Sequence, residues 1–259
     1  MKNKRIILLL TVLLISALVI VGGVSMFWNY ISKKPSPESD GENVFSEVTY
    51  VAFGDSITVG ADHNNNYEPM ENPYPKLVKK TLGLKSVQNL ASSGATFCAN
   101  DRGNVCMTDR VLGYTDQADI ISVWLGFNDW ARTFPLGAIQ DNTNETIYGC
   151  LNLMAEHLTT NHKDAFVFFI TPYKTALIRN DEYTLPDVVN AIFEVANNYG
   201  IPVLDMYNTG NFESEMYKEY SDGVHPTQEF MINYTAPQIS EFIKQNYNKQ
   251  KKIKNSTPI

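Results

Sequence analysis

The sequence predicts one α/β domain, a three-layer α/β/α sandwich built on a parallel sheet of about five strands. Three observations support this fold class. The chain has 259 residues, which suits a single α/β domain of roughly 200 to 250 residues with a short appendage. Hydrophobic residues make up 44% and charged residues 19%, the balance of a folded globular protein. Short apolar runs alternate with amphipathic stretches, which is typical of parallel strands joined by helices.

Five short runs are predicted to form the strands. The first, TYVAF, is closed by Gly54, Asp55 and Ser56, and the third and fourth, ADIISVWL and AFVFFI, are almost continuously apolar. Continuous apolar strands of this length indicate a sheet that is covered on both faces. In chain order the predicted strands are 49–53, 86–90, 118–125, 165–170 and 201–204.

The stretches between the strands have the spacing of amphipathic helices. Ile147, Leu151 and Met154, for example, lie on one helical face. In a doubly wound sheet of this kind the ligand site lies at the carboxyl ends of the strands. The predicted helices are 75–82, 146–158, 185–199 and 227–247.

The N-terminus is a separate segment. Lys2, Lys4 and Arg5 precede a run without charged residues, and about 20 apolar residues span a bilayer as a helix. We expect an uncleaved anchor, and a signal peptide cut near the weak site at 23–25 is the alternative. The domain is then exported in both cases, as a single-pass protein of the cell membrane or as a secreted one. The predicted parts are a cytoplasmic basic end (1–5), a transmembrane signal anchor (6–27), a flexible linker (28–46), the domain (47–247) and a disordered tail (248–259).

The charge balance excludes a large class of partners. The net charge is −7, from 21 Lys and Arg against 28 Asp and Glu. Without the three cations of the N-terminus the balance is 18 against 28, or −10. Phosphate binding requires clustered cations, so we expect no nucleic-acid partner.

Four short motifs follow the predicted strands or precede the last helix. Together they resemble the SGNH (GDSL-type) serine hydrolase family of esterases and lipases, whose four blocks carry Ser, Gly, Asn and His in this order. The resemblance covers the whole domain and implies the flavodoxin-like fold of that family. The motifs are GDSIT at 54–58, NLASSG at 89–94, GFND at 126–129 and DGVHP at 222–226.

The residues themselves predict a nucleophile and its base. A serine hydroxyl such as Ser56 attacks an ester only when a neighbouring base takes its proton, and histidine suits this role near neutral pH. Of the four histidines, His225 is preceded by Asp222, which can hold the imidazole and stabilise its protonated form. His157 and His162 are expected to be exposed or capping residues.

The family resemblance also implies an oxyanion hole. Carried over to this sequence, its donors are the backbone N–H groups of Ser56 and Gly94 and the side chain of Asn128. Asp55 and Asp129 are expected to hold loops in place. The sequence has neither a metal-ligand cluster nor a phosphate-binding glycine loop, so no metal and no cofactor are predicted.

The expected reaction is hydrolysis of a short acyl ester through an acyl-enzyme on Ser56. No long apolar insertion suggests a lipid-binding lid, and export favours O-acetyl groups on envelope glycans. The alternatives are a lysophospholipase, lipase or thioesterase of the same family, an O-acyltransferase to glycans and, least expected, a non-catalytic glycan-binding protein. Residues that can line the substrate site are His63, Phe127, Trp130 and Tyr173, with Tyr67, Phe97 and Trp124 as further aromatic residues near the motifs.

The three cysteines lie in the part expected to be exported, where disulfides are allowed. Cys98 and Cys106 bracket a short loop after Gly94, and a bridge between them would stiffen the rim of the site. Free thiols, or a pairing that involves Cys150, are the alternatives. The odd number leaves at least one thiol unpaired within the chain.

Overall fold

The computed structural model describes residues 43–99, 103, 105–175, 177, 179, 182–210 and 222–256. The predicted basic end and anchor, and all but the last four residues of the predicted linker, lie outside these ranges. Within the described part, no helix combines the length and the apolar character needed to cross a bilayer.

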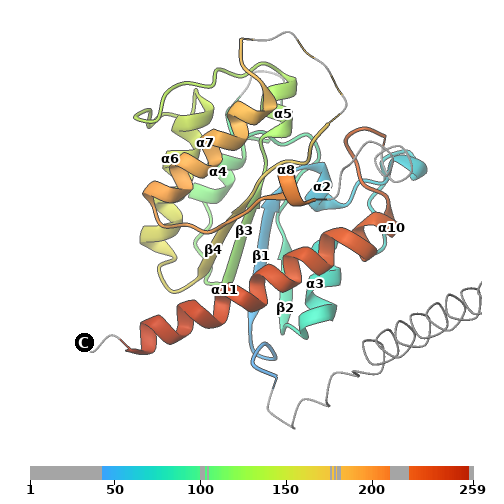
Figure 1. The fold of residues 1–259 in the computed structure, drawn as a ribbon, viewed down its shortest axis with the longest axis vertical. Coiled ribbons are helices and arrows are strands. Elements are labelled where there is room, and N and C mark those ends of the chain that lie inside the picture. The colour runs from blue at the N-terminus through green and yellow to red at the C-terminus, as the bar shows by residue number, and fades with distance from the viewer. Residues whose placement is uncertain are drawn as a thin grey trace, which may run out of the picture. The chain divides into compact units, whose positions relative to one another are not determined.

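A five-stranded parallel sheet forms the centre of the domain (Figure 1). The strand order is β2-β1-β3-β4-β5, so the chain starts in the interior of the sheet and winds outwards in both directions. All pairs of neighbouring strands are parallel, which confirms the predicted sheet. The strands are β1 (Thr49–Gly54), β2 (Ser86–Asn89), β3 (Ile120–Trp124), β4 (Phe166–Ile170) and β5 (Val203–Leu204).

Alternate residues of each central strand enter two separate hydrophobic cores. In β1, Val51 and Phe53 join one core, whereas Tyr50 and Ala52 join the other. Burial on both faces explains why these strands are continuously apolar. The first core is closed by α4 (Met107–Leu112), α6 (Ile147–Asn161) and α7 (Leu185–Asn198), and the second by α3 (Tyr74–Leu82) and α11 (Ala236–Ser256) (Figure 1). These are the three layers that the sequence predicts.

The C-terminal helical region differs from its prediction as one helix over 227–247. It consists of α10 (Gln228–Phe230), a π-helical turn η2 (Met231–Thr235) and α11. The expectation of a disordered tail from residue 248 is wrong as far as Ser256, because α11 continues to that residue. Lys and Gln, which are good helix formers, dominate this stretch, and no Gly or Pro interrupts it before Pro258.

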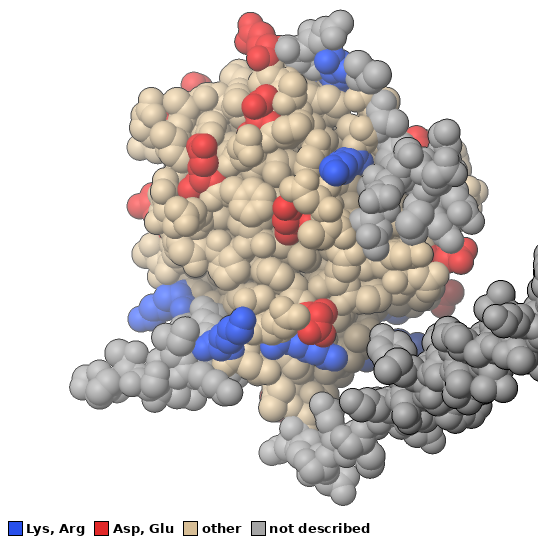
Figure 2. Space-filling model, in the orientation of Figure 1, with Lys and Arg blue, Asp and Glu red and all other residues tan. Residues whose placement is uncertain are grey.

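Short helical turns follow the carboxyl ends of three strands and were not predicted. They are α2 (Ser56–Val59) after β1, α5 (Phe127–Ala131) after β3 and α8 (Met206–Thr209) after β5. On the face drawn in Figure 2, most Lys and Arg side chains lie along the lower edge, whereas Asp and Glu are scattered over the rest. This face therefore carries no continuous band of positive charge.

Candidate active site

Ser56 is the first residue of α2, directly beyond the carboxyl end of β1. Asp55 caps this short helix, because its Oδ1 accepts a hydrogen bond from the backbone N–H of Ile57 at 3.0 Å. Gly54 allows the tight strand-to-helix turn, since a Cβ at this position would lie 2.0 Å from Oγ1 of Thr58. The turn presents Ser56 at the strand end, where 9% of its surface is exposed.

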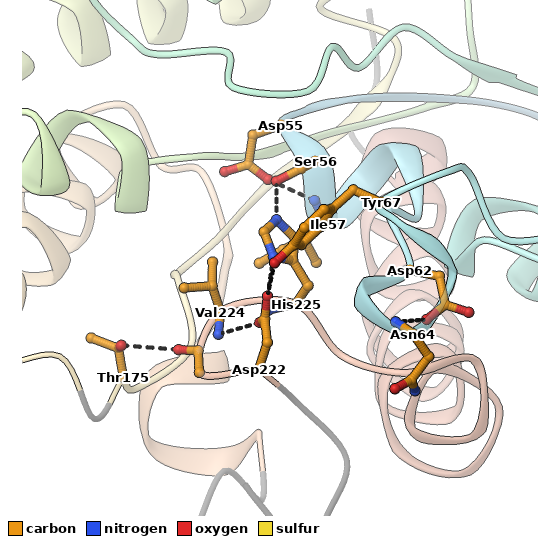
Figure 3. Close-up of polar contacts among 11 residues, drawn as sticks. Asp55, Ser56, Ile57, Asp62, Asn64, Tyr67, Thr175, Asp222, Val224 and His225 are labelled. Carbon is orange, nitrogen blue, oxygen red and sulfur yellow. Dashed lines mark hydrogen bonds and ion pairs between the residues drawn. The ribbon is translucent and has the colours of Figure 1, made fainter. Parts of the chain in front are cut away.

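His225 and Asp222 complete a continuous chain of hydrogen bonds with Ser56 (Figure 3). Nε2 of His225 lies 2.8 Å from Oγ of Ser56, and Nδ1 of the same ring lies 3.1 Å from Oδ2 of Asp222. The structure thus brings together three residues that the sequence singled out, with 169 positions between the serine and the histidine.

The DGVHP turn holds Asp222 by its other oxygen. Oδ1 accepts hydrogen bonds from the backbone N–H groups of Val224, at 2.9 Å, and His225, at 2.6 Å. Gly223 has a φ of 105°, which favours glycine, and its carbonyl accepts from Oγ1 of Thr175 at 3.0 Å. This last bond ties the turn to the segment that follows β4.

Asp222 is arranged to stay ionised. Burial acts to raise its pKa, but the hydrogen bonds from the His225 backbone, the Val224 backbone and the imidazole outweigh burial and lower the pKa below its usual value. With an ionised Asp222, the ring proton of His225 belongs on Nδ1, and Nε2 is left to accept from Ser56. This is the tautomer that a general base requires.

The other two motifs reach the same strand ends. The backbone N–H of Ser92 donates to the carbonyl of Gly54 at 3.0 Å, and Nδ2 of Asn128 lies 3.3 Å from Oδ2 of Asp55. All four motifs therefore meet beside Ser56.

The predicted oxyanion donors differ in their availability. No acceptor among the described residues takes a hydrogen bond from the N–H of Ser56 or of Gly94, so both are open to a ligand. Nδ2 of Asn128 instead donates to the carbonyl of Ala95, at 3.0 Å, and to Asp55. The role of Asn128 as an oxyanion donor remains a prediction, and it requires release of the longer bond to Asp55.

Two buried carboxyl groups hold the loops around the site, as expected. Asp55 binds the N-terminus of α2, and Asp129 accepts hydrogen bonds from the backbone N–H groups of Phe97, at 3.0 Å, and Cys98, at 3.3 Å. Burial raises the pKa of Asp55 to about 7 and that of Asp129 to about 6, against hydrogen bonds that act to lower both.

These two carboxyl groups predict a thermal stability that falls as the pH rises. A raised pKa means that the folded state holds the proton more tightly than the unfolded state does. The resulting stability is complete below about pH 4 and is lost as the pH rises through about 7. Asp222, with its lowered pKa, acts in the opposite direction, but only below about pH 4. We therefore expect a higher melting temperature near pH 5 than near pH 8, measured by circular dichroism.

Repulsion between the surface charges of this acidic chain would also lower the melting temperature as the pH rises. Added salt distinguishes this repulsion from the effect of the two buried carboxyl groups. Repulsion between exposed charges is largely screened at about 0.5 M NaCl, whereas a buried carboxyl group is screened much less. A melting temperature that no longer falls between these pH values at high salt would contradict the assignment to Asp55 and Asp129.

Most of the predicted substrate-lining residues are taken up by core packing. Phe127, Trp130 and Tyr173 expose only 8%, 4% and 3% of their surface and belong to the two hydrophobic cores. The hydroxyl of Tyr173 is bonded to Oγ1 of Thr235 at 2.7 Å. That these aromatic residues line the substrate site stays a prediction. His63 begins the 3-10 turn η1 (His63–Asn65), and no hydrogen bond in the described part joins it to Ser56, His225 or Asp222.

Tyr67 is the aromatic residue that does lie at the site. Its ring is 53% exposed, its hydroxyl donates to Oδ2 of Asp222 at 3.1 Å, and its ring lies edge-on to His225 with centroids 5.2 Å apart. The sequence indicated only an aromatic residue near a motif, because no local signal reports a contact across 155 positions.

The bridge between Cys98 and Cys106 is not formed, and all three cysteines are free thiols. Cys98 points instead into the core, where its Sγ lies 3.2 Å from that of Cys150 on α6. Sγ of Cys106 donates to the carbonyl of Phe97 at 3.3 Å. Spacing along the chain suggested the pair, but the two side chains turn to different partners.

Comparison with known proteins agrees with this arrangement. The model of the GDSL-like lipase/acylhydrolase family matches residues 52–231, and the search of the curated proteins found no match. Among solved structures, a protein from Lactobacillus plantarum is 25% identical with a TM-score of 0.66, and the match covers 77% of this chain and 98% of that one. A possible lipase from Chitinophaga pinensis is 21% identical with a TM-score of 0.59, covering 77% and 98%. A carbohydrate acetylesterase family member from Sinorhizobium meliloti is 16% identical with a TM-score of 0.54, covering 76% and 98%.

The family match spans well over half of the chain. It begins within β1, two residues before the Gly-Asp-Ser turn, and ends at the first residue of η2. It therefore takes in the second half of β1, the other four strands and both segments that meet at the Ser56–His225 contact. The chain therefore belongs to the GDSL-like lipase/acylhydrolase family and is a hydrolase of ester bonds.

Proposed function

We propose that this hydrolase cleaves short acyl esters through a Ser56–His225–Asp222 triad and an acyl-enzyme. The observation that carries the proposal is the unbroken relay from Oγ of Ser56 to Nε2 of His225, at 2.8 Å, and from Nδ1 to Asp222, at 3.1 Å. A nucleophile, a base and a group that orients the base are the parts that acyl transfer requires.

The first half of the reaction forms the acyl-enzyme. His225 takes the proton of Ser56 through Nε2 as Oγ attacks the ester carbonyl, and Asp222 stabilises the imidazolium that results. The N–H groups of Ser56 and Gly94 are available to bind the oxyanion of the tetrahedral intermediate. The imidazolium then gives its proton to the departing alcohol, and the acyl group remains on Oγ.

The second half regenerates the serine. A water molecule attacks the acyl carbonyl while His225 takes one of its protons. When the second tetrahedral intermediate collapses, the proton returns to Oγ of Ser56 and the carboxylic acid leaves. Transfer of the acyl group to a sugar hydroxyl instead of water would use the same residues.

Several features favour a small acyl group. Three cavities in the described part of the chain, of 370, 610 and 350 Å³, lie away from Ser56 and His225. The sequence contains no long apolar insertion that could form a lid. The Sinorhizobium meliloti protein of the same fold is a carbohydrate acetylesterase family member.

We further propose that the enzyme works outside the cytoplasm, held by the apolar segment 6–27 or released from it. The substrate class that fits this location is an O-acetylated glycan of the cell envelope. A small acyl group leaves the sugar side exposed, which suits an open site.

Hydrolysis of p-nitrophenyl esters from acetyl to palmitoyl tests the acyl preference. The full chain in a mild detergent is the enzyme, with Ser56→Ala as the inactive control and Ser46→Ala, an exposed serine of the turn before β1, as the matched variant. We expect kcat/KM to fall by about tenfold or more between butyryl and octanoyl esters, because the sequence has no long apolar insertion to shelter the longer chain. A kcat/KM that rises with acyl chain length would indicate a lipase. If neither the wild type nor Ser56→Ala hydrolyses any of these esters, the proposed hydrolytic function is wrong.

A further inference from the structure

Tyr67 touches both members of the acid–base pair from a distant part of the chain (Figure 3). Its hydroxyl donates to Oδ2 of Asp222 at 3.1 Å, the same oxygen that faces Nδ1 of His225. Its ring meets the imidazole at 67°, an edge-to-face geometry that aromatic rings favour. These two contacts constrain the carboxylate and the imidazole together.

The carboxylate of Asp222 can accept the hydrogen bond from Tyr67 but no further one. An ionised carboxylate offers about four lone-pair positions. Two backbone N–H groups, of Val224 and His225, occupy Oδ1, and the imidazole and Tyr67 occupy Oδ2. The carboxylate is thereby fully satisfied and fixed in rotation.

The loop that carries Tyr67 is built to hold it there. Asn66 and Tyr67 have φ values of 52° and 61°, a left-handed conformation that side chains with a Cβ adopt at some cost. The loop is closed by a bridge between Ala61 and Pro69 and by a bond from the N–H of Tyr67 to the carbonyl of Asp62 at 2.8 Å. Strained residues of this kind persist where the surrounding structure over-determines them, often at functional sites.

A second clamp joins the two segments that meet at the site. The side chain of Gln228 accepts from the backbone N–H of Asn72 at 3.0 Å and donates to its carbonyl at 2.8 Å. Asn72 lies five positions after Tyr67, and Gln228 three positions after His225. The contact between Tyr67 and Asp222 is thus held in place by the closed loop around Tyr67 and by the bonds between Asn72 and Gln228.

We propose that Tyr67 is a positioning residue of this enzyme, acting through Asp222 to orient His225 for proton transfer with Ser56. This inference rests on the proposed triad mechanism. The hydrogen bond to the carboxylate raises the pKa of Tyr67, so the phenol keeps the proton that it donates. Because Tyr67 draws negative charge from Oδ2, it also tempers the pull of Asp222 on the imidazolium.

Replacing Tyr67 with phenylalanine isolates the hydroxyl, since the ring remains against His225. Among the described residues, those bonded to or stacked on the imidazole are Ser56, Asp222 and Tyr67. Without the hydroxyl of Tyr67, more negative charge faces Nδ1, and we expect the acid limb of kcat/KM to move to higher pH by about half a unit. We expect kcat on p-nitrophenyl acetate to fall by about fivefold to tenfold with KM nearly unchanged. Tyr67→Leu removes the ring as well as the hydroxyl, and we expect its kcat to fall further than that of Tyr67→Phe.

Tyr148→Phe is the matched control. The hydroxyl of Tyr148 donates to Oε2 of Glu194 at 2.6 Å, an exposed tyrosine–carboxylate bond between α6 and α7. This variant should leave kcat and the pH profile as they are in the wild type.

Three results for Tyr67→Phe would overturn the proposal. The first is an enzyme with the kcat and the acid limb of the wild type. The second is a rise in KM at unchanged kcat, which would make Tyr67 a substrate contact, and the third is a lower melting temperature with no change in the pH profile. A ¹⁵N NMR titration of the histidines, with His225→Gln to assign the signal, reports the effect of Tyr67→Phe without turnover. If the wild type hydrolyses no ester but the NMR titration curve of His225 still lies at higher pH in Tyr67→Phe than in the wild type, the hydrolytic mechanism fails and the positioning role stands. If that titration curve does not move, the positioning role fails by itself.

Discussion

Replacing Ser56 with alanine is expected to lower kcat/KM for p-nitrophenyl acetate at least about a thousandfold. In the proposed mechanism the hydroxyl oxygen of Ser56 forms the acyl bond, and among the described residues no other hydroxyl is bonded to Nε2 of His225. The variant keeps the Asp55 cap of α2, because that bond reaches the backbone N–H of Ile57. The residual rate should therefore reflect the oxyanion donors and His225 acting on water, which is a much slower route.

Three measurements make the Ser56→Ala result interpretable. The far-UV spectrum and the melting temperature should match those of the wild type, which shows that only the nucleophile is lost. Ser46→Ala should retain full activity. An alkyl phosphonate probe should label the wild type on Ser56, located by peptide mass spectrometry, and should not label Ser56→Ala. A variant that keeps a tenth or more of the wild-type rate would mean that another group attacks the ester.

Asp222→Asn is the second large effect, with an expected fall in kcat of about 10²- to 10⁴-fold. The direction in which the new amide points follows from the turn. Its oxygen is needed to accept from the N–H groups of Val224 and His225, so its NH₂ group takes the place of Oδ2. That NH₂ faces Nδ1 of His225 and favours the tautomer with the proton on Nε2, which cannot accept from Ser56.

The comparison variant for this prediction is Asp116→Asn, which neutralises an exposed carboxylate elsewhere on the surface. It should retain wild-type kcat. Melting temperatures of the two variants should be close, because the DGVHP turn keeps its backbone hydrogen bonds in Asp222→Asn. A kcat for Asp222→Asn within threefold of the wild type, measured across the pH range, would exclude Asp222 from the mechanism.

Local and repetitive signals in the sequence predicted most of the fold. The strands at β1, β3 and β4 are continuously apolar because both faces are buried, and helices α6 and α7 begin within one residue of their predicted positions. The limit of α11 was missed because a polar helix that runs past the core has no apolar stripe to mark it.

At the site, the motifs predicted which residues meet but not how their neighbours pack. His225 contacts Ser56 through Nε2 and Asp222 through Nδ1, as predicted. The aromatic residues were assigned by proximity in the sequence, and tertiary packing buried three of them while it placed Tyr67 against His225. The thiol of Cys98 lies against that of Cys150 and not that of Cys106 for the same reason, since side-chain direction is set by contacts between distant elements.

The long separation between Ser56 and His225 also sets the order in which the enzyme is assembled. Ribosomes make β1, an interior strand of the sheet, and Ser56 early, and they add Asp222, His225 and the helix that packs over the second core last. A nascent chain therefore carries a serine without a base through most of its synthesis. In the proposed mechanism, the serine therefore gains its base only when the segment that carries Asp222 and His225 folds against Ser56.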